Sequence, residues 1–87
     1  MTSLITIETE KHNHGGWLKI YIPYHTTEKT IAIIQNTHGE VIKLIKLNEG
    51  TNSIDISNIF EEVVDVKIET AYEIILRKIN LTNYEKY

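Results

Sequence analysis

The chain has 87 residues, no cysteine and a net charge of −3 at pH 7, with 12 acidic against 9 basic side chains. This length fits one small domain, and the lack of cysteine excludes disulfides, thiolate nucleophiles and cysteine-bound metals. The acidic balance argues against a nucleic-acid partner, which needs a basic face, and no apolar run approaches the ~18 residues of a membrane helix.

The first predicted strand spans residues 3–10, where Ile5 and Ile7 alternate with Thr6 and Glu8. The start of the chain lacks the basic segment and the long apolar stretch of a secretory signal. As written, the chain is therefore expected in the cytoplasm. An exported location is expected instead if it is an excised part of a secreted protein.

The next segment, "KHNHGG", predicts a loop, because Gly15 and Gly16 give the backbone freedom to turn. His12 and His14 in this loop are weak candidate metal ligands, since imidazole suits zinc, copper or nickel. Two ligands do not complete a structural zinc site. We therefore expect solvated histidines, no bound metal and no other cofactor.

The second predicted strand, residues 17–22, separates inward from outward positions. Its inward side chains are Leu18, Ile20 and Ile22. Trp17 and Tyr21 point the other way, with Lys19 between them. Exposed aromatic rings favour binding of protein or sugar, whereas the alternative is that both rings pack beneath a neighbouring loop or close one end of the sandwich.

The segment "IAIIQNTHGEVIKLIKL", residues 31–47, predicts a hairpin with strands over 30–35 and 40–47. Gly39 suits the left-handed position that closes such a turn. Both strands carry Ile, Val or Leu on both faces, so alternation alone does not decide which face belongs to the core.

The remaining predicted strands span residues 51–56, 63–70 and 73–81, and the last of them is apolar on both sides. Between the first two, "SNIFEE" is the one place where a helical turn is expected, with Ser57 as its cap. Residues 83–87 are expected to form a loose tail.

Together, these seven strands, with turn signals about 8–12 residues apart, indicate an all-β fold. The simplest architecture is a small Ig-like antiparallel β-sandwich that spans residues 1–82 as one domain. A small open barrel is the alternative.

Several positions along the chain also follow a known family pattern. One strand ends at Asn36 and turns at Gly39, a later strand carries Asp55, and the last strand carries Lys78 and Ile79 near its end. In these positions residues 17–81 resemble the C-terminal sorting domain of type IX secretion cargo proteins of Bacteroidetes, the Por secretion tail. The chain departs from the family's Pro, Gly and Tyr at Phe60, Glu62 and Val64.

This resemblance implies a hairpin register in which the core receives Ala32, Ile34, Ile42 and Leu44. It leaves an outward apolar set that consists of Ile31, Ile33, Val41 and Ile45. With Trp17 and Tyr21, this set is the predicted interaction surface, of a size that marks association. The alternative is a bulge near Ile45 that reverses the phase, so that some of these side chains reach the core.

The sequence carries no catalytic constellation: no serine has an evident base nearby, and the glycines do not resemble a phosphate-binding loop. We therefore predict a non-enzymatic protein-interaction domain, which the resemblance identifies with a sorting module. One alternative is a small cytoplasmic protein that shares only the fold and forms a homo-oligomer through its apolar sheet face. A carbohydrate- or metal-binding module is another.

Overall fold

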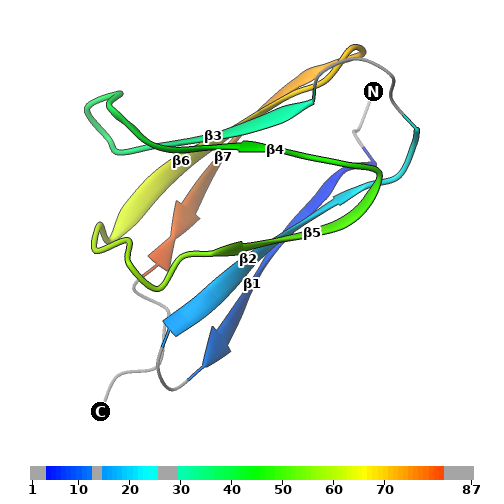
Figure 1. The fold of residues 1–87 in the computed structure, drawn as a ribbon. Helices are drawn as coiled ribbons and strands as arrows, with labels where there is room; N and C mark the ends of the chain where they lie inside the picture. The colour runs from blue at the N-terminus through cyan, green and yellow to red at the C-terminus, as the bar shows by residue number, and fades with distance from the viewer. Residues whose placement is uncertain (1–3, 13–14, 26–29, 82–87) are drawn as a thin grey trace.

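Seven strands make up the regular structure of a computed structural model, which describes residues 4–12, 15–25 and 30–81 (Figure 1). Their bounds are β1 (Thr6–His12), β2 (Gly15–Ile22), β3 (Ile31–Gln35), β4 (Val41–Lys46), β5 (Gly50–Asp55), β6 (Val63–Glu69) and β7 (Ile74–Asn80). The predicted all-β fold is confirmed. The predicted tail, residues 83–87, lies outside the described residues.

The strands divide into two antiparallel sheets that face each other (Figure 1). One sheet has the order β1-β2-β5 and the other the order β4-β3-β6-β7. The β3–β4 hairpin lies within the second sheet, whereas the chain crosses from one sheet to the other between β4 and β5. Two facing sheets form the predicted β-sandwich rather than the alternative barrel.

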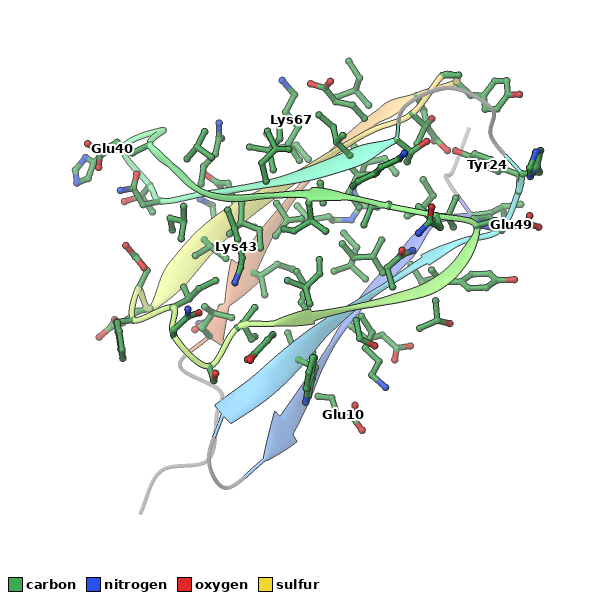
Figure 2. The ribbon with its side chains drawn as sticks, in the orientation of Figure 1. Glu10, Tyr24, Glu40, Lys43, Glu49 and Lys67 are labelled. Atoms are coloured by element: carbon green, nitrogen blue, oxygen red, sulfur yellow. The ribbon has the colours of Figure 1, made fainter. Side chains whose placement is uncertain are left out.

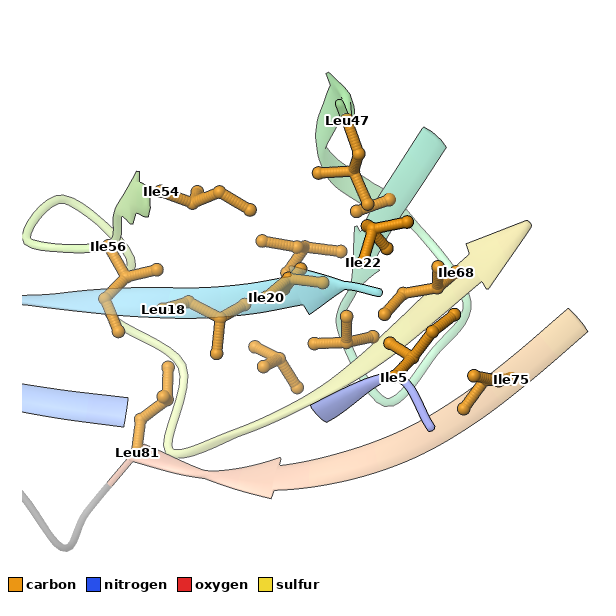
Figure 3. Close-up of a cluster of buried hydrophobic side chains, with 14 residues drawn as sticks. Ile5, Leu18, Ile20, Ile22, Leu47, Ile54, Ile56, Ile68, Ile75 and Leu81 are labelled. Carbon is orange, nitrogen blue, oxygen red and sulfur yellow. The ribbon is translucent and has the colours of Figure 1, made fainter. Parts of the chain in front are cut away.

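The core lies between the sheets, because buried and solvent-facing positions alternate along the central strands β2, β3 and β6. Figure 3 shows the buried cluster. It consists of Ile5, Leu18, Ile20, Ile22, Ala32, Ile34, Leu47, Ile54, Ile56, Val64, Val66, Ile68, Ile75 and Leu81. Each fully buried Ile or Leu contributes about 1.5–3 kcal/mol relative to exposure. In a chain without disulfides, this cluster is the main source of stability.

Asn36 closes the turn between β3 and β4. Its Oδ1 accepts hydrogen bonds from the backbone N–H groups of His38 and Glu40, at 2.9 and 3.0 Å. Its Nδ2 donates to Glu40 Oε1 at 2.7 Å. Gly39 adopts φ 85°, a left-handed conformation that a Cβ atom disfavours, as the sequence predicts.

An irregularity in β4 reverses its alternation. Ile34 pairs with Lys43, but the next residue, Gln35, pairs with Val41, so that Ile42 is an extra residue opposite β3. An extra residue on one strand of an antiparallel pair is a β-bulge. Side chains before and after Ile42 therefore do not alternate between the two faces of the sheet in one continuous pattern.

The bulge makes two predicted orientations wrong. Leu44, expected in the core, pairs with the outward-facing Ile33 and is 60% exposed. Ile45, expected outward, pairs with the buried Ala32 and packs against the core. The alternative prediction, a bulge that changes which side chains of this strand face the core, is correct. The bulge lies at Ile42, however, and not near Ile45.

Two side chains connect distant parts of the sandwich (Figure 2). Lys43 Nζ donates to the backbone oxygen of Asp55 at 3.3 Å and so joins β4 to β5 in the opposite sheet. Tyr24, in the segment after β2, donates its hydroxyl to Glu73 Oε2 at 2.7 Å. Its ring meets that of Tyr72 edge-on, with centroids 5.3 Å apart. Burial is the main cause that raises the pKa of Tyr24.

The segment 57–62 does not form the predicted helical turn. The N–H of Ile59 donates to the oxygen of Ile56 at 3.1 Å, and the N–H of Ser57 donates to Asp55 Oδ1 at 2.9 Å. These bonds make a single tight turn. A helix does not follow because its first turn fixes several residues for one hydrogen bond, and this segment is too short to add more.

Candidate functional site

The outer surface of the four-stranded sheet carries a group of apolar side chains. This group, called the apolar face, consists of Ile31, Ile33, Val41, Leu44, Ile74 and Leu76. On the edge strands β4 and β7, Val41, Leu44, Ile74 and Leu76 are 57%, 60%, 67% and 61% exposed. Ile31 and Ile33 on β3 are half-buried between them.

The strand register arranges the apolar face in rows, because paired residues point to the same side of a sheet. One row runs from β4 to β7 through Leu44, Ile33, Lys67 and Leu76. The next row runs through Lys46, Ile31, Glu69 and Ile74. Each row thus has apolar residues on both sides of a charged residue on β6.

The two charged residues on β6 neutralise each other. Lys67 Nζ lies 3.2 Å from Glu69 Oε2 at the surface. An exposed pair of this kind contributes about 0–1 kcal/mol to stability. Its position in the middle of the apolar face matters more, because any partner that covers the face must also meet one positive and one negative group.

The structure places the predicted surface residues in two groups. Ile31, Ile33 and Val41 lie on the apolar face, as the sequence predicts, whereas Ile45 is directed to the core. The prediction misses Ile74 and Leu76, which pair with Glu69 and Lys67 and face outward. Their signal is present in the sequence, since this last strand is apolar on both sides.

Trp17 and Tyr21 lie on the opposite side of the molecule. The polar face, defined as the outer surface of β1, β2 and β5, has Trp17, Lys19 and Tyr21 along its central strand. The rings of Trp17 and Tyr21 are 38% and 45% exposed, so no described loop covers them. Lys19 Nζ lies 3.0 Å from Glu10 Oε1, which holds the two side chains together between the rings.

Two open hollows flank Lys19 on the polar face. One, of about 240 Å³, is lined by Glu10, Trp17, Lys19 and Ser53. The other, of about 380 Å³, is lined by Thr6, Glu8, Lys19, Tyr21 and Thr51. Each hollow thus combines one aromatic ring with hydroxyl and carboxylate groups. The second hollow is large enough for one unit of a longer ligand, and both hollows are open to solvent.

The positions that carry the family resemblance have structural partners. Asn36 and Gly39 form the β3–β4 turn. Asp55 accepts hydrogen bonds from Ser57, which hold the pKa of its carboxyl below the ordinary value. Lys78 Nζ lies 3.2 Å from Asp65 Oδ1 on the outer surface of β6 and β7.

The candidate metal ligands cannot be placed together. The side chain of His12 and all of His14 lie outside the described part of the chain. His25 Nδ1 lies 3.5 Å from Glu49 Oε1, and His38 is exposed in the β3–β4 turn. Among residues 4–12, 15–25 and 30–81, no group of three or more His, Cys, Asp or Glu side chains is arranged to hold a metal ion.

No likeness to a known protein adds to the chemistry of these two faces. No family model, curated protein or solved structure matches the chain. Within the described ranges, no helix is long and apolar enough to cross a membrane.

Proposed function

We propose that the chain is a non-enzymatic protein-interaction domain and that the apolar face binds its partner. The observation that supports this most is the gathering of apolar side chains from three strands on one outer surface, where those on the edge strands are more than half exposed. Groups of exposed apolar side chains of this kind mark interaction sites, because leaving them in water is unfavourable.

A second copy of the chain is the partner that the charges of this face favour. In one such dimer the two sheets pack face to face. Its two-fold axis lies between the sheets, perpendicular to β6, and passes between Lys67 and Glu69. Each row then faces the neighbouring row of the other copy. Lys67 meets the second copy's Glu69, Ile33 meets Ile31, and Leu76 meets Ile74.

Other symmetric arrangements are less favourable. A two-fold axis that runs along β6 brings Lys67 against Lys67 and Glu69 against Glu69 of the second copy. Like charges that oppose each other in a partly desolvated interface are destabilising. Of these two arrangements, the charges favour the crossed axis, which opposes positive to negative groups on β6. On β4 this axis leaves Leu44 opposite Lys46 of the second copy.

The expected dimer is weak. If each copy buries about 400 Å² of apolar surface, a common size for such a patch, the two copies gain roughly 20 kcal/mol at ~25 cal/mol per Å². Lost rotational and translational freedom costs about 4–15 kcal/mol, and ordering of side chains adds to this. With total costs of about 12 kcal/mol, a surplus of about 8 kcal/mol remains, which corresponds to a dissociation constant of about 1 μM.

Sedimentation or light scattering of the chain tests the proposal. At about 200 μM protein, well above a micromolar dissociation constant, the expected mass is that of a dimer. Leu44→Lys is expected to give a monomer, because it brings a second lysine towards Lys46 of the other copy. Phe60→Lys is the matched control, since Phe60 is also apolar and exposed but lies in the loop after β5. A wild-type monomer at this concentration contradicts self-association.

A charge exchange tests the position of the axis. Lys67→Glu places two carboxylates opposite each other across the proposed axis and is expected to weaken the dimer about tenfold or more. Adding Glu69→Lys restores opposite charges and is expected to restore the dimer. If the double variant associates no better than the single variant, the proposed axis is wrong.

The order of the strands also supports an Ig-like sandwich. In this chain β1, β2 and β5 share one sheet, and β3, β6 and β7 share the other with β4 at its edge. Ig-type domains likewise place their first, second and fifth strands together, opposite their third, sixth and seventh. Domains with this strand arrangement commonly act by binding other proteins, which supports an interaction role for this chain.

A component of the type IX secretion apparatus is the second candidate partner. It is favoured by the resemblance described above, two of whose positions, Asn36 and Gly39, belong to the β3–β4 turn. In a type IX-competent host, a reporter exported with the whole chain at its C-terminus is expected at the cell surface. The same fusion with Leu44→Lys and Leu76→Lys is expected to stay in the periplasm. Periplasmic retention of the unmodified fusion contradicts this candidate.

A further inference from the structure

We infer that the polar face is a binding site for a neutral oligosaccharide. This site is separate from the apolar face, because the two lie on the outer surfaces of different sheets. It is built by the central strand β2, with hydroxyl and carboxylate side chains supplied by β1 and β5 on either side.

Trp17 and Tyr21 provide two stacking positions. They stand four positions apart on one face of a strand, which places their Cα atoms about 13 Å apart. The C–H groups on one side of a sugar ring are apolar and slightly positive, and they match the negative face of an aromatic ring. The distance exceeds the size of one ring, so the arrangement suits an oligosaccharide that contacts both aromatic side chains.

The hollows between the rings supply the polar contacts that a sugar needs. Sugar hydroxyls both donate and accept hydrogen bonds, and the hollows offer the hydroxyls of Thr51 and Ser53, the carboxylate of Glu8 and the ammonium of Lys19. The ion pair of Lys19 with Glu10 holds two of these groups in position before a ligand arrives. The site is therefore partly preorganised.

The charge of the polar face favours a neutral ligand. Lys19 is accompanied by the carboxylates of Glu8, Glu10 and Asp55, so the surface carries more negative than positive groups. An anionic glycan or a nucleic acid would be repelled. A proline-rich peptide also uses aromatic grooves, but it offers few groups to bond the acidic and hydroxyl side chains that line these hollows.

Fluorescence titration of the full chain gives a direct test, because Trp17 is its single tryptophan. The probes are the soluble pentasaccharides of cellulose, xylan, mannan and chitin, each added to about 10 mM, which exceeds a millimolar dissociation constant. At least one is expected to change the Trp17 emission in a saturable way. Amide NMR shifts should map to β1, β2 and β5.

Variants separate sugar binding from unspecific effects. Tyr21→Ala is expected to reduce the affinity for the bound pentasaccharide at least tenfold, whereas Phe60→Ala, an exposed aromatic residue outside both faces, should leave it unchanged. Trp17→Ala is followed by NMR, with the same loss expected. The inference is overturned if no pentasaccharide binds, if shifts map elsewhere, or if a polyproline peptide binds the face and the sugars do not.

Discussion

Asn36 contributes three side-chain hydrogen bonds to the β3–β4 turn, two through Oδ1 and one through Nδ2. Asparagine suits this position because its short amide accepts from backbone N–H groups and donates at the same time. Aspartate could accept the same two bonds, but its charge would repel Glu40. Since the turn sets the hairpin register, Asn36 influences which side chains of β3 and β4 face solvent.

Replacing Asn36 by Ala is therefore expected to lower the free energy of unfolding by about 1–2 kcal/mol, because each hydrogen bond has a net value of about 0.5–1.5 kcal/mol. Thr37→Ala, at the exposed neighbouring position, should change it by less than about 0.5 kcal/mol. Urea unfolding followed by Trp17 fluorescence measures both values. Equal effects of the two substitutions would show that the amide does not hold the turn.

Single residues differ in how well the sequence predicts them. Asn36 and Gly39 could be identified because few residue types suit a tight turn. Tyr24 could not, because its partners Thr70 and Glu73 lie 46 and 49 positions further along the chain. Only the three-dimensional fold brings those groups together.

Strand β4 shows how one inserted residue decides which side chains are exposed. In an uninterrupted strand Val41 and Ile45 share one face, as predicted. The bulge directs Val41 outward while Ile42 and Ile45 both pack against the core. Leu44 is left on the outer surface, where it extends the apolar face to the edge of the sheet.

Two alanine substitutions in β4 test this orientation. Ile45→Ala is expected to lower the free energy of unfolding by about 2 kcal/mol, near the lower end of the range for buried isoleucine, because Ile45 is only partly buried. Leu44→Ala should lower it by less than about 0.5 kcal/mol. Thermal unfolding in solutions far more dilute than the dissociation constant of the proposed dimer gives both values. A larger effect at Leu44 would contradict the bulge.

The sequence could not predict the bulge, for a physical reason. Ile42 with Leu44 and Val41 with Ile45 are equally apolar pairs, so burial of either pair stabilises the hairpin to a similar extent. No glycine or proline marks the irregular position. Which pair is buried depends on contacts with the opposite sheet. One of these is the hydrogen bond that Lys43 Nζ donates to the backbone oxygen of Asp55.

The whole molecule has two outer surfaces of opposite character, one apolar and one polar, separated by the core. Its strands could be predicted because alternation is a local property. The full apolar face could not, because Ile74 and Leu76 join it through pairing of β3 with β6 and of β6 with β7. The sequence marks both residues, because β7 is apolar on both sides, but it does not show which residues of β3 and β6 lie beside them.

The back-to-back position of the two faces has a consequence for avidity. A dimer joined through the apolar face stacks its four sheets so that the two polar faces point in opposite directions. Two sites that point in opposite directions cannot bind neighbouring segments of one short ligand. They would instead bridge separate ligand molecules, so that the dimer acts as a cross-linker and gains strength only on surfaces or polymers that present many copies of the ligand.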